Sequence, residues 1–425
     1  MSHNRALPSA PLLRIPTRLV WYAACLGSLM LFLTACDDNP TGVGVDVGDD
    51  PLQGGEPVTV NLPPTSLNVE RRAPVTGAVA GNLPERFFAG RVNDPLVGTT
   101  EAQGFLNLFQ PIEELSGSLY NDPLTDVSLR LAPISVYGDT TSTVTMALYD
   151  MPAPWDGAGA RSDTTLAEGE QILTFELDPT DEETLVPLPR TWINENEPVL
   201  RDTTGGGEAF LDAFAGFRIA PSSGNAVIGF NRNDTALRVA TSTDTTNFNG
   251  RVSLTTIERT PSDALPDDRV LVQGGFANAL TFTYDFDAPP LDTLRGTPVN
   301  RAEFVLPVDT TLWADSTPDG FARPTPDSYS FTGTSTDGDQ TVTLSSNLTP
   351  FDEGLRFTGD TPARIFEEGF LRESAFSEFV ITPNATEGGT SNEISLDVAL
   401  FHRLPTAPDA PDAEGPRATV TVTPY

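Results

Sequence analysis

Short runs in which apolar and polar residues alternate recur from about Asn68 to the end of the chain, with turn-forming residues between them. Alternation predicts a strand with one buried face, because successive side chains point to opposite faces of a sheet. The 38 prolines disfavour helix interiors and are tolerated on edge strands. The pattern predicts an all-β protein of jelly-roll-like sandwiches. The clearest runs are Val127–Leu131, Val144–Tyr149, Ala226–Phe230, Ala279–Tyr284 and Ile394–Val398.

A weak internal repeat predicts two tandem β-sandwiches, at residues 68–262 and 263–425. Phe210–Phe214 followed by Phe217–Pro221 is echoed by Phe370–Ser374 followed by Phe379–Pro383, although strand-plus-proline fragments also recur by chance. Only residues 207–214 and 363–376 are predicted to form short helices. Residues 404–417 are rich in Pro, Ala and Asp and predict a loop, and residues 418–424 predict a last strand that returns to a sheet.

The N-terminus has the three parts of a secretory signal. Arg5, Arg14 and Arg18 precede a 17-residue apolar run, Leu19–Ala35, that ends in small residues. Leu33-Thr34-Ala35-Cys36 resembles the bacterial lipoprotein box. The resemblance implies that residues 1–35 are a signal peptide and that Cys36 becomes diacylated. The alternative is an uncleaved membrane helix, for which about 17 residues is the lower limit.

Residues 36–67 are rich in turn formers and predict a flexible tether, in which about 30 extended residues span up to ~100 Å. Asp37-Asp38 resembles the acidic export signal of surface lipoproteins in the Bacteroidetes lineage. In other Gram-negative bacteria an Asp at this place resembles an inner-membrane retention signal. We expect export through the general pathway and lipid anchoring at the outer membrane, exposed on the surface. Because Cys25 lies in the signal, no disulfide within the mature chain is expected.

The chain is strongly acidic and contains no lysine. The chain has 25 basic residues, all Arg, against 59 Asp and Glu, and its net charge of −34 becomes −37 when three signal-peptide arginines are removed. This composition resembles that of halophile proteins, whose self-repulsion is screened because the Debye length at molar salt is about 3 Å. The same charge argues against nucleic acid as a partner, because phosphate contacts require basic patches.

Three further segments resemble a family of uncharacterised Bacteroidetes-lineage lipoproteins, known only as a domain of unknown function. They are Phe88–Ala102, Val270–Gly275 and Val299–Pro307, with Arg301 where the family usually has Lys. The resemblance would cover nearly all of the mature chain. It implies structural roles for these motifs, such as a tight turn at Asp94-Pro95. The family carries no established activity, so the resemblance transfers no catalytic residues.

A weaker resemblance is to extracellular carbohydrate-binding β-sandwiches, carried by the strands Ser128–Leu131 and Thr145–Asp150 and by a following Trp155. Exposed aromatic rings stack on sugars, and Trp155 and Tyr149 are the candidates for this role; Trp192 and Trp313 are further aromatics. Trp155 lies in the turn-like segment Met151–Gly157. Packing in the core is the competing interpretation for each of them, since aromatic residues dominate cores.

The sequence lacks most of the residue types on which common catalytic mechanisms depend. His402 is the single histidine outside the signal peptide, there is no lysine, and no phosphate-binding glycine loop occurs. No metal site is therefore expected from Cys and His. Oxygen ligands for Ca²⁺ exist at Asp139 and at Asp337-Gly338-Asp339, without a full loop pattern, so solvated turns are the simpler interpretation. A glycosidase needs only two carboxylates, which 59 acidic residues supply by chance.

The sequence thus favours a non-enzymatic, lipid-anchored cell-envelope protein without a cofactor. Its role would be surface structure, adhesion or service to an outer-membrane protein complex. The alternative is a glycan-binding module with a polysaccharide partner, and the third hypothesis is a carboxylate-only glycoside hydrolase.

Overall fold

The computed structural model describes most of the chain from residue 56 onward. None of the helices among these described residues is long and apolar enough to cross a membrane. Cys36, the signal peptide, the first part of the predicted tether and nearly all of the loop 404–417 lie outside them. The described residues are 56–62, 64–71, 86–112, 117–155, 164–274, 278–326, 329–337, 340–348, 350–351, 354–358, 360–371, 376–383, 396–402 and 416–423.

The largest sheet has twelve antiparallel strands and branches at β4. Its main path runs β17-β6-β11-β3-β4-β13-β12-β5-β9. At the branch, β10 also pairs with β4 and leads through β7 to β8. The strands are β3 (Arg86–Asp94), β4 (Gly98–Phe109), β5 (Leu124–Leu131), β6 (Pro133–Asp139), β7 (Val144–Asp150), β8 (Gln171–Leu177), β9 (Thr184–Pro187), β10 (Phe217–Ser223), β11 (Ala226–Asn231), β12 (Ala236–Thr241), β13 (Thr245–Pro261) and β17 (Phe321–Ala322).

Three further antiparallel sheets contain the remaining strands. One has the order β1-β24-β16-β21-β20, one β19-β18-β22-β15-β2, and the third is the pair β14-β23. Their bounds are β1 (Val58–Leu62), β2 (Ser66–Arg71), β14 (Arg269–Gln273), β15 (Asn278–Thr283), β16 (Val299–Leu306), β18 (Tyr329–Asp337), β19 (Gln340–Leu348), β20 (Pro350–Phe351), β21 (Gly354–Thr358), β22 (Phe376–Pro383), β23 (Val398–His402) and β24 (Arg417–Val422). The prediction of an all-β, sandwich-like fold is confirmed.

Alternation along the strands builds two aromatic-rich cores. In β5, Val127, Leu129 and Leu131 are fully buried, as their spacing predicts. They belong to a core inside the twelve-stranded sheet. The second core lies between the two five-stranded sheets and contains a cluster of rings in which Phe282 stacks on Phe379 at 5.3 Å. Full burial of each such ring stabilises the fold by about 1.5–3 kcal/mol.

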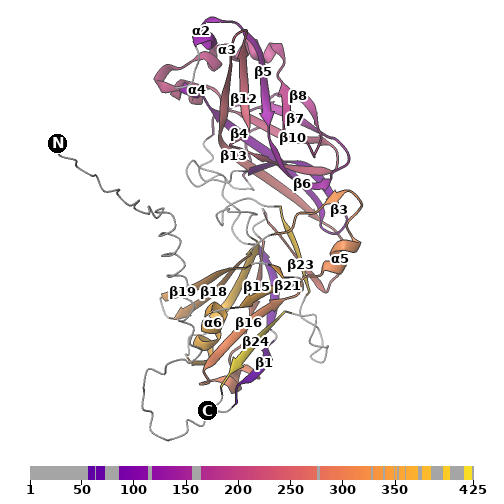
Figure 1. The fold of residues 1–425 in the computed structure, drawn as a ribbon, viewed down its shortest axis with the longest axis vertical. Helices are drawn as coiled ribbons and strands as arrows, with labels where there is room; N and C mark the ends of the chain where they lie inside the picture. The colour runs from indigo at the N-terminus through magenta and orange to yellow at the C-terminus, as the bar shows by residue number, and fades with distance from the viewer. Residues whose placement is uncertain are drawn as a thin grey trace, which may run out of the picture. The chain divides into compact units, whose positions relative to one another are not determined.

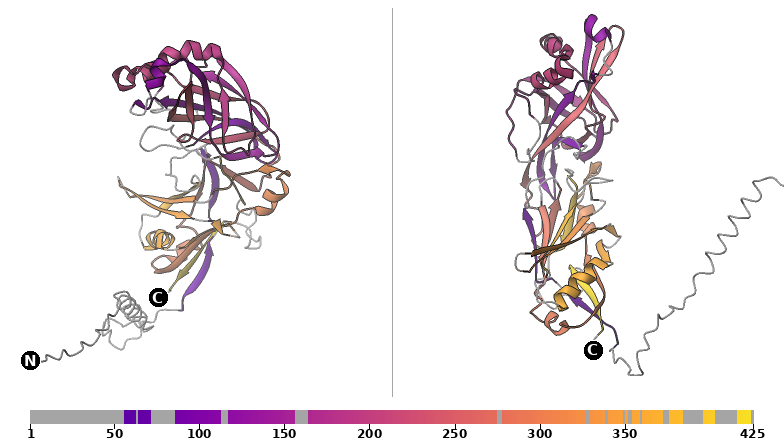
Figure 2. Two further views of the ribbon diagram at one scale, coloured as in Figure 1. Left: turned by 45° about the horizontal axis from the view of Figure 1, so that its top comes forward. Right: turned by 90° about the vertical axis from the view of Figure 1, so that its left-hand side faces the viewer.

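Five short α-helices are described. α2 (Gly117–Asn121), α3 (Arg190–Arg201) and α4 (Glu208–Ala213) lie at one end of the twelve-stranded sheet (Figure 1). α5 (Thr310–Asp315) is N-capped by Asp309, whose carboxylate accepts from the Leu312 amide at 2.8 Å. α6 (Asp360–Leu371) packs against β16 and contacts strands of both five-stranded sheets (Figure 2). The predicted helices at 207–214 and 363–376 correspond to α4 and, with different ends, to α6.

The tether prediction is wrong for its last part. Residues 58–62 form β1, whose partner is β24, and Ser66 begins β2, whose partner is β15. The turn-rich composition concealed the alternation of Val58, Val60 and Leu62, which places Leu62 in the core at 1% exposure. The return of the last strand to a sheet is confirmed, because β24 lies between β1 and β16.

Two local predictions are also corrected. α3 was not predicted, because Pro198 lies within it; Trp192, Ile193 and Leu200 are nevertheless buried along one face and hold the helix against the core. Of the predicted strand Ile394–Val398, Ile394 and Ser395 lie outside the described residues, Leu396 and Asp397 are not in a strand, and Val398 begins β23. The predicted boundary between residues 262 and 263 falls directly after β13, but β17 from beyond it pairs with β6. The division into two domains stays a prediction.

Candidate functional site

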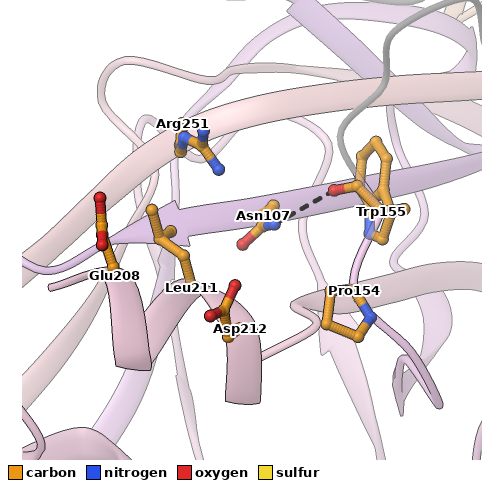
Figure 3. Close-up of a pocket in the computed structure, with 7 residues that line it drawn as sticks. All are labelled: Asn107, Pro154, Trp155, Glu208, Leu211, Asp212 and Arg251. Carbon is orange, nitrogen blue, oxygen red and sulfur yellow. Dashed lines mark hydrogen bonds between the residues drawn. The ribbon is translucent and has the colours of Figure 1, made fainter. Parts of the chain in front are cut away.

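A pocket of about 620 Å³ opens between α4, β4, β13 and the loop that follows β7 (Figure 3). We name it the Trp155 pocket. Its volume lies within the range of small-molecule sites, about 300–1,000 Å³. It is lined by Asn107, Pro154, Trp155, Glu208, Leu211, Asp212 and Arg251.

The indole of Trp155 is held in place at one side of this pocket. Its Nε1 donates a hydrogen bond to the carbonyl of Ala215 at 3.0 Å. Its ring meets Phe105 edge-on, with centroids 6.3 Å apart. The side chain remains half-buried rather than enclosed. Trp155 is therefore an oriented aromatic surface that borders the pocket, with its one polar atom already satisfied.

Asn107 lies between Trp155 and α4 (Figure 3) and is only 1% exposed. Its Oδ1 accepts from the Leu108 amide at 2.7 Å, which fixes which end of the side chain is the acceptor. Its Nδ2 donates to the Trp155 carbonyl at 3.4 Å. An amide nitrogen carries two hydrogens, and the bond to the Trp155 carbonyl uses one of them.

Arg251 reaches the pocket because it is the extra residue of a β-bulge. In the pairing of β13 with β4, Gly250 lies opposite Leu108 and Val252 opposite Asn107, so that Arg251 has no partner. A bulge redirects the side chain of its extra residue. The neighbouring Gly250 is required here, since a Cβ would lie 2.3 Å from the Arg232 carbonyl. The Arg232 guanidinium in turn donates to the Arg251 carbonyl at 3.4 Å.

The acidic wall of the pocket comes from α4. Glu208, Leu211 and Asp212 share one face at helical spacing and line the pocket (Figure 3). The opposite face carries Phe210, which is fully buried and packs on Phe214 and Phe248 with centroids 5.0 and 5.3 Å away. This aromatic packing holds a six-residue helix that would not be stable alone.

The pocket therefore presents mixed chemistry on fixed walls. A guanidinium and an amide N–H are donors, two carboxylates are acceptors, and Trp155, Pro154 and Leu211 supply apolar surface. This combination suits a ligand with several hydroxyl groups and an apolar face, which is the character of a sugar ring.

The other predicted aromatic site, Tyr149, does not line this pocket. It lies on β7, where the guanidinium of Arg218 covers its ring at 4.1 Å. That guanidinium also reaches Glu168 at 3.0 Å. The structure thus leaves Trp155 in the pocket and gives Tyr149 a cation–π partner within the chain.

The remaining tryptophans have structural contacts. Trp192 is 4% exposed, and its Nε1 donates to both carboxylate oxygens of Asp150, at 3.0 and 2.8 Å. Burial of Asp150 raises the pKa of its carboxyl, against the effect of the Trp192 hydrogen bond. Trp313 on α5 packs under the guanidinium of Arg323 at 4.6 Å.

Within the described part of the chain, no group of three or more His, Cys, Asp or Glu is placed to hold a metal ion. Asp139 accepts from the Thr141 amide at 2.8 Å and from its hydroxyl at 2.7 Å, as in an ordinary turn. Asp337 ends β18, whereas Gly338 and Asp339 lie outside the described residues. His402 is the last residue of β23.

Sequence reasoning missed Asn107, Glu208, Asp212 and Arg251 as neighbours of Trp155. Only one signal was present: Gly250 interrupts the alternation of β13, and a glycine inside a strand marks a bulge. The predicted lipidation residue, Cys36, lies outside the described residues.

No family model matches this chain, and no curated protein matches its sequence. The class of the protein is therefore defined by its own fold, which is all-β and antiparallel, with a polar pocket among its described residues.

Proposed function

We propose that this chain is a non-enzymatic, lipid-anchored protein of the bacterial cell envelope, with its lipid on Cys36. The carrying observation is Leu33-Thr34-Ala35-Cys36 at the end of the apolar run behind a basic N-terminus. Its role is surface structure, adhesion or service to an outer-membrane protein complex, at the outer membrane and exposed to the medium. A lipoprotein cysteine carries more than one acyl chain, which gives stable anchoring where a single chain is marginal.

The anchor and the first strand are separated by a short stretch of chain. Residues 37–57 lie between Cys36 and β1, and fully extended they reach about 70 Å. A turn-rich stretch of this length lets the β-unit contact ligands or partners above the lipid surface.

The test is to express the chain and its Cys36→Ser variant in a halophilic host that processes lipoproteins. We expect radiolabelled palmitate to enter the native protein alone, and the native protein alone to stay with washed membranes. Digestion of intact cells by an added protease tests surface exposure. Equal labelling and membrane retention of Cys36→Ser would contradict lipid anchoring.

A second function, glycan binding, is favoured by the Trp155 pocket. Trp155 offers an oriented ring, and donors and acceptors surround the adjoining space. The experiment is affinity electrophoresis through gels that contain single polysaccharides, in molar salt. We expect retardation of the native protein to be lost in Trp155→Ala and kept in Ile134→Ala, a control at an apolar side chain that is 44% exposed. Retention by Trp155→Ala equal to that of the native protein would exclude this pocket as the glycan site.

A further inference from the structure

We propose that the Trp155 pocket recognises a sugar ring that carries a carboxylate, as in a polysaccharide of uronic acids, and that Arg251 binds this carboxylate. The inference rests on the glycan-binding function proposed above and names the chemical class of the glycan. Arg251 would act as the specificity-determining residue, and Trp155 as the surface on which the ring stacks.

The first support is the unpaired guanidinium of Arg251. Acidic residues outnumber arginines 59 to 25, and two carboxylates line the same pocket. Arg251 nevertheless forms no ion pair with any residue that the structure describes. Some other guanidiniums do, since Arg201 reaches Glu197 at 2.7 Å and Arg356 reaches Glu303 at 2.8 Å, whereas Arg91 and Arg238 form none with described residues either. A guanidinium left open in a pocket is a site for a bidentate carboxylate from outside the chain.

The second support is that the position of Arg251 is built into the backbone. The bulge leaves Arg251 without a cross-strand partner, Gly250 permits the close approach to Arg232, and the Arg232 guanidinium binds the Arg251 carbonyl. Bulges occur beside binding sites because they redirect one side chain without ending the sheet. An arginine that only faces solvent would not need a bulge, a neighbouring glycine and a hydrogen bond to its carbonyl to fix its position.

The other walls fit the rest of a uronic acid. The second hydrogen of the Asn107 amide can donate to a hydroxyl or ring oxygen, and Glu208 and Asp212 can accept hydroxyl hydrogens. The ring of Trp155 is available to the apolar face of the sugar. Arg251 is the single cation among the lining residues, so it is the group in the pocket that can compensate a ligand carboxylate.

Electrostatics then predict an unusual dependence on salt. A uronate approaching a mature chain of net charge −37 is repelled at low ionic strength. In molar salt the Debye length falls to about 3 Å, which removes this long-range repulsion. The guanidinium–carboxylate contact, at about 2.7–2.9 Å, lies within that length and keeps much of its attraction. Binding should therefore strengthen as salt is added, opposite to an ordinary ion pair.

The experiment uses the full lipoprotein in mild detergent and isothermal titration calorimetry, in dilute buffer and in molar salt. The probes are oligomers of galacturonic, mannuronic and glucuronic acid, each compared with its carboxyl-reduced, neutral counterpart. We expect at least one acidic oligomer to bind about tenfold to a hundredfold more tightly than its neutral counterpart in molar salt. We also expect its affinity to be lower in dilute buffer.

Two arginine variants test whether the preference for acidic oligomers depends on Arg251. Arg251→Gln should abolish the preference, so that the acidic oligomer binds no more tightly than its neutral counterpart. Arg238→Gln is the matched control, because it removes the same charge from β12, outside the residues that line the pocket. Loss of preference in both variants would show a general charge effect and overturn the inference.

A further variant tests the charge balance without removing Arg251. Asp212→Asn keeps an acceptor oxygen but removes one negative charge from the exposed face of α4, so it should raise affinity for the acidic oligomer. No change or a fall would contradict the inference. Equal binding of acidic and neutral oligomers would overturn it and leave glycan binding intact. If no oligomer binds in dilute buffer or in molar salt, both the uronate inference and the glycan-binding function are overturned. Lipid anchoring is tested separately through Cys36.

Discussion

Arg323 and Asp94, 229 residues apart in the chain, form a bidentate ion pair that is almost completely buried. Arg323 donates from Nε to Asp94 Oδ2 at 2.7 Å and from Nη2 to Oδ1 at 2.8 Å. The side chains are 1% and 0% exposed. The pair ties the end of β3 to the residue that directly follows β17.

Further hydrogen bonds surround the pair. Asp94 accepts from the Leu96 and Val97 amides at 2.8 and 3.0 Å and from the Tyr137 hydroxyl at 2.9 Å. Arg323 Nη1 donates to Thr317 Oγ1 at 2.7 Å. The attraction within a buried ion pair offsets the cost of desolvation only when additional hydrogen bonds of this kind are present.

Removing one partner should therefore be costly. Arg323→Met leaves the Asp94 carboxylate buried without its counter-ion, and we expect a loss of about 3–5 kcal/mol in the free energy of unfolding. Denaturant unfolding in molar salt measures it. The double variant Asp94→Asn with Arg323→Met should recover part of the loss, since no unpaired charge remains. A loss below about 1 kcal/mol for Arg323→Met would mean that the pair is no stronger than one on the surface.

Acid should weaken the same contact. Burial acts to raise the pKa of Asp94, but the hydrogen bonds and charge of Arg323 and the Val97 and Leu96 amides outweigh it and place the pKa below 3.8. Because the folded-state pKa is lower than the unfolded one, the stabilisation is present above the unfolded value and is lost as pH falls through the folded value. We would measure the free energy of unfolding of the native protein and of Asp94→Asn from neutral pH to below 3.8. The two curves of stability against pH should converge as pH falls. Parallel curves would contradict the assignment.

Salt should raise the stability of the whole chain but leave this pair unchanged. Self-repulsion among 59 carboxylates on the protein is screened by added salt, so the melting temperature should rise steeply from dilute buffer to molar salt. The coupling energy of Asp94 and Arg323, from a double-mutant cycle, should stay the same because solvent ions do not reach a buried pair. An unchanged melting temperature would remove the interpretation of the composition as halophilic.

Gly250→Ala should disturb the bulge that carries Arg251. The added Cβ would lie 2.3 Å from the Arg232 carbonyl, so the strands must shift, at a cost of about 1–3 kcal/mol. Gly117→Ala is the matched control, because its Cβ meets nothing within 4 Å, and we expect little change or a small gain. Thermal unfolding measures both. Equal effects at the two positions would show that the bulge tolerates a side chain.

The sequence predicted the strands wherever alternation was long enough to be seen, as in β5, β7 and β11. The sequence-based prediction was wrong where local composition disfavours an element that packing in the folded chain stabilises. β1 lies within a turn-rich stretch, yet it is held by five residue pairs with β24, and α3 contains a proline. These elements are decided by partners far away in the chain, which no local pattern reveals.

The candidate site was predicted only in part, for a related reason. Trp155 was visible because its segment is turn-like, and the helix that became α4 was predicted from its composition. Nothing local connects them with Asn107 or Arg251, since the pocket is formed by strand register. The bulge at Arg251 decides which side chain enters the pocket, and register is a property of two strands together.

The pairing of β1 with β24 also has a consequence for the order in which the chain can fold. Thr59 and Thr421, 362 positions apart, share a hydrogen bond of 3.0 Å between their hydroxyls. The first strand, β1, therefore waits for its neighbour until residues 417–422 are present. A chain cut short before residue 417 lacks β24 and leaves open edges on β1 and β16, where other chains can pair. Such a product would be prone to aggregation, so completion of the last strand closes both sheet edges at once.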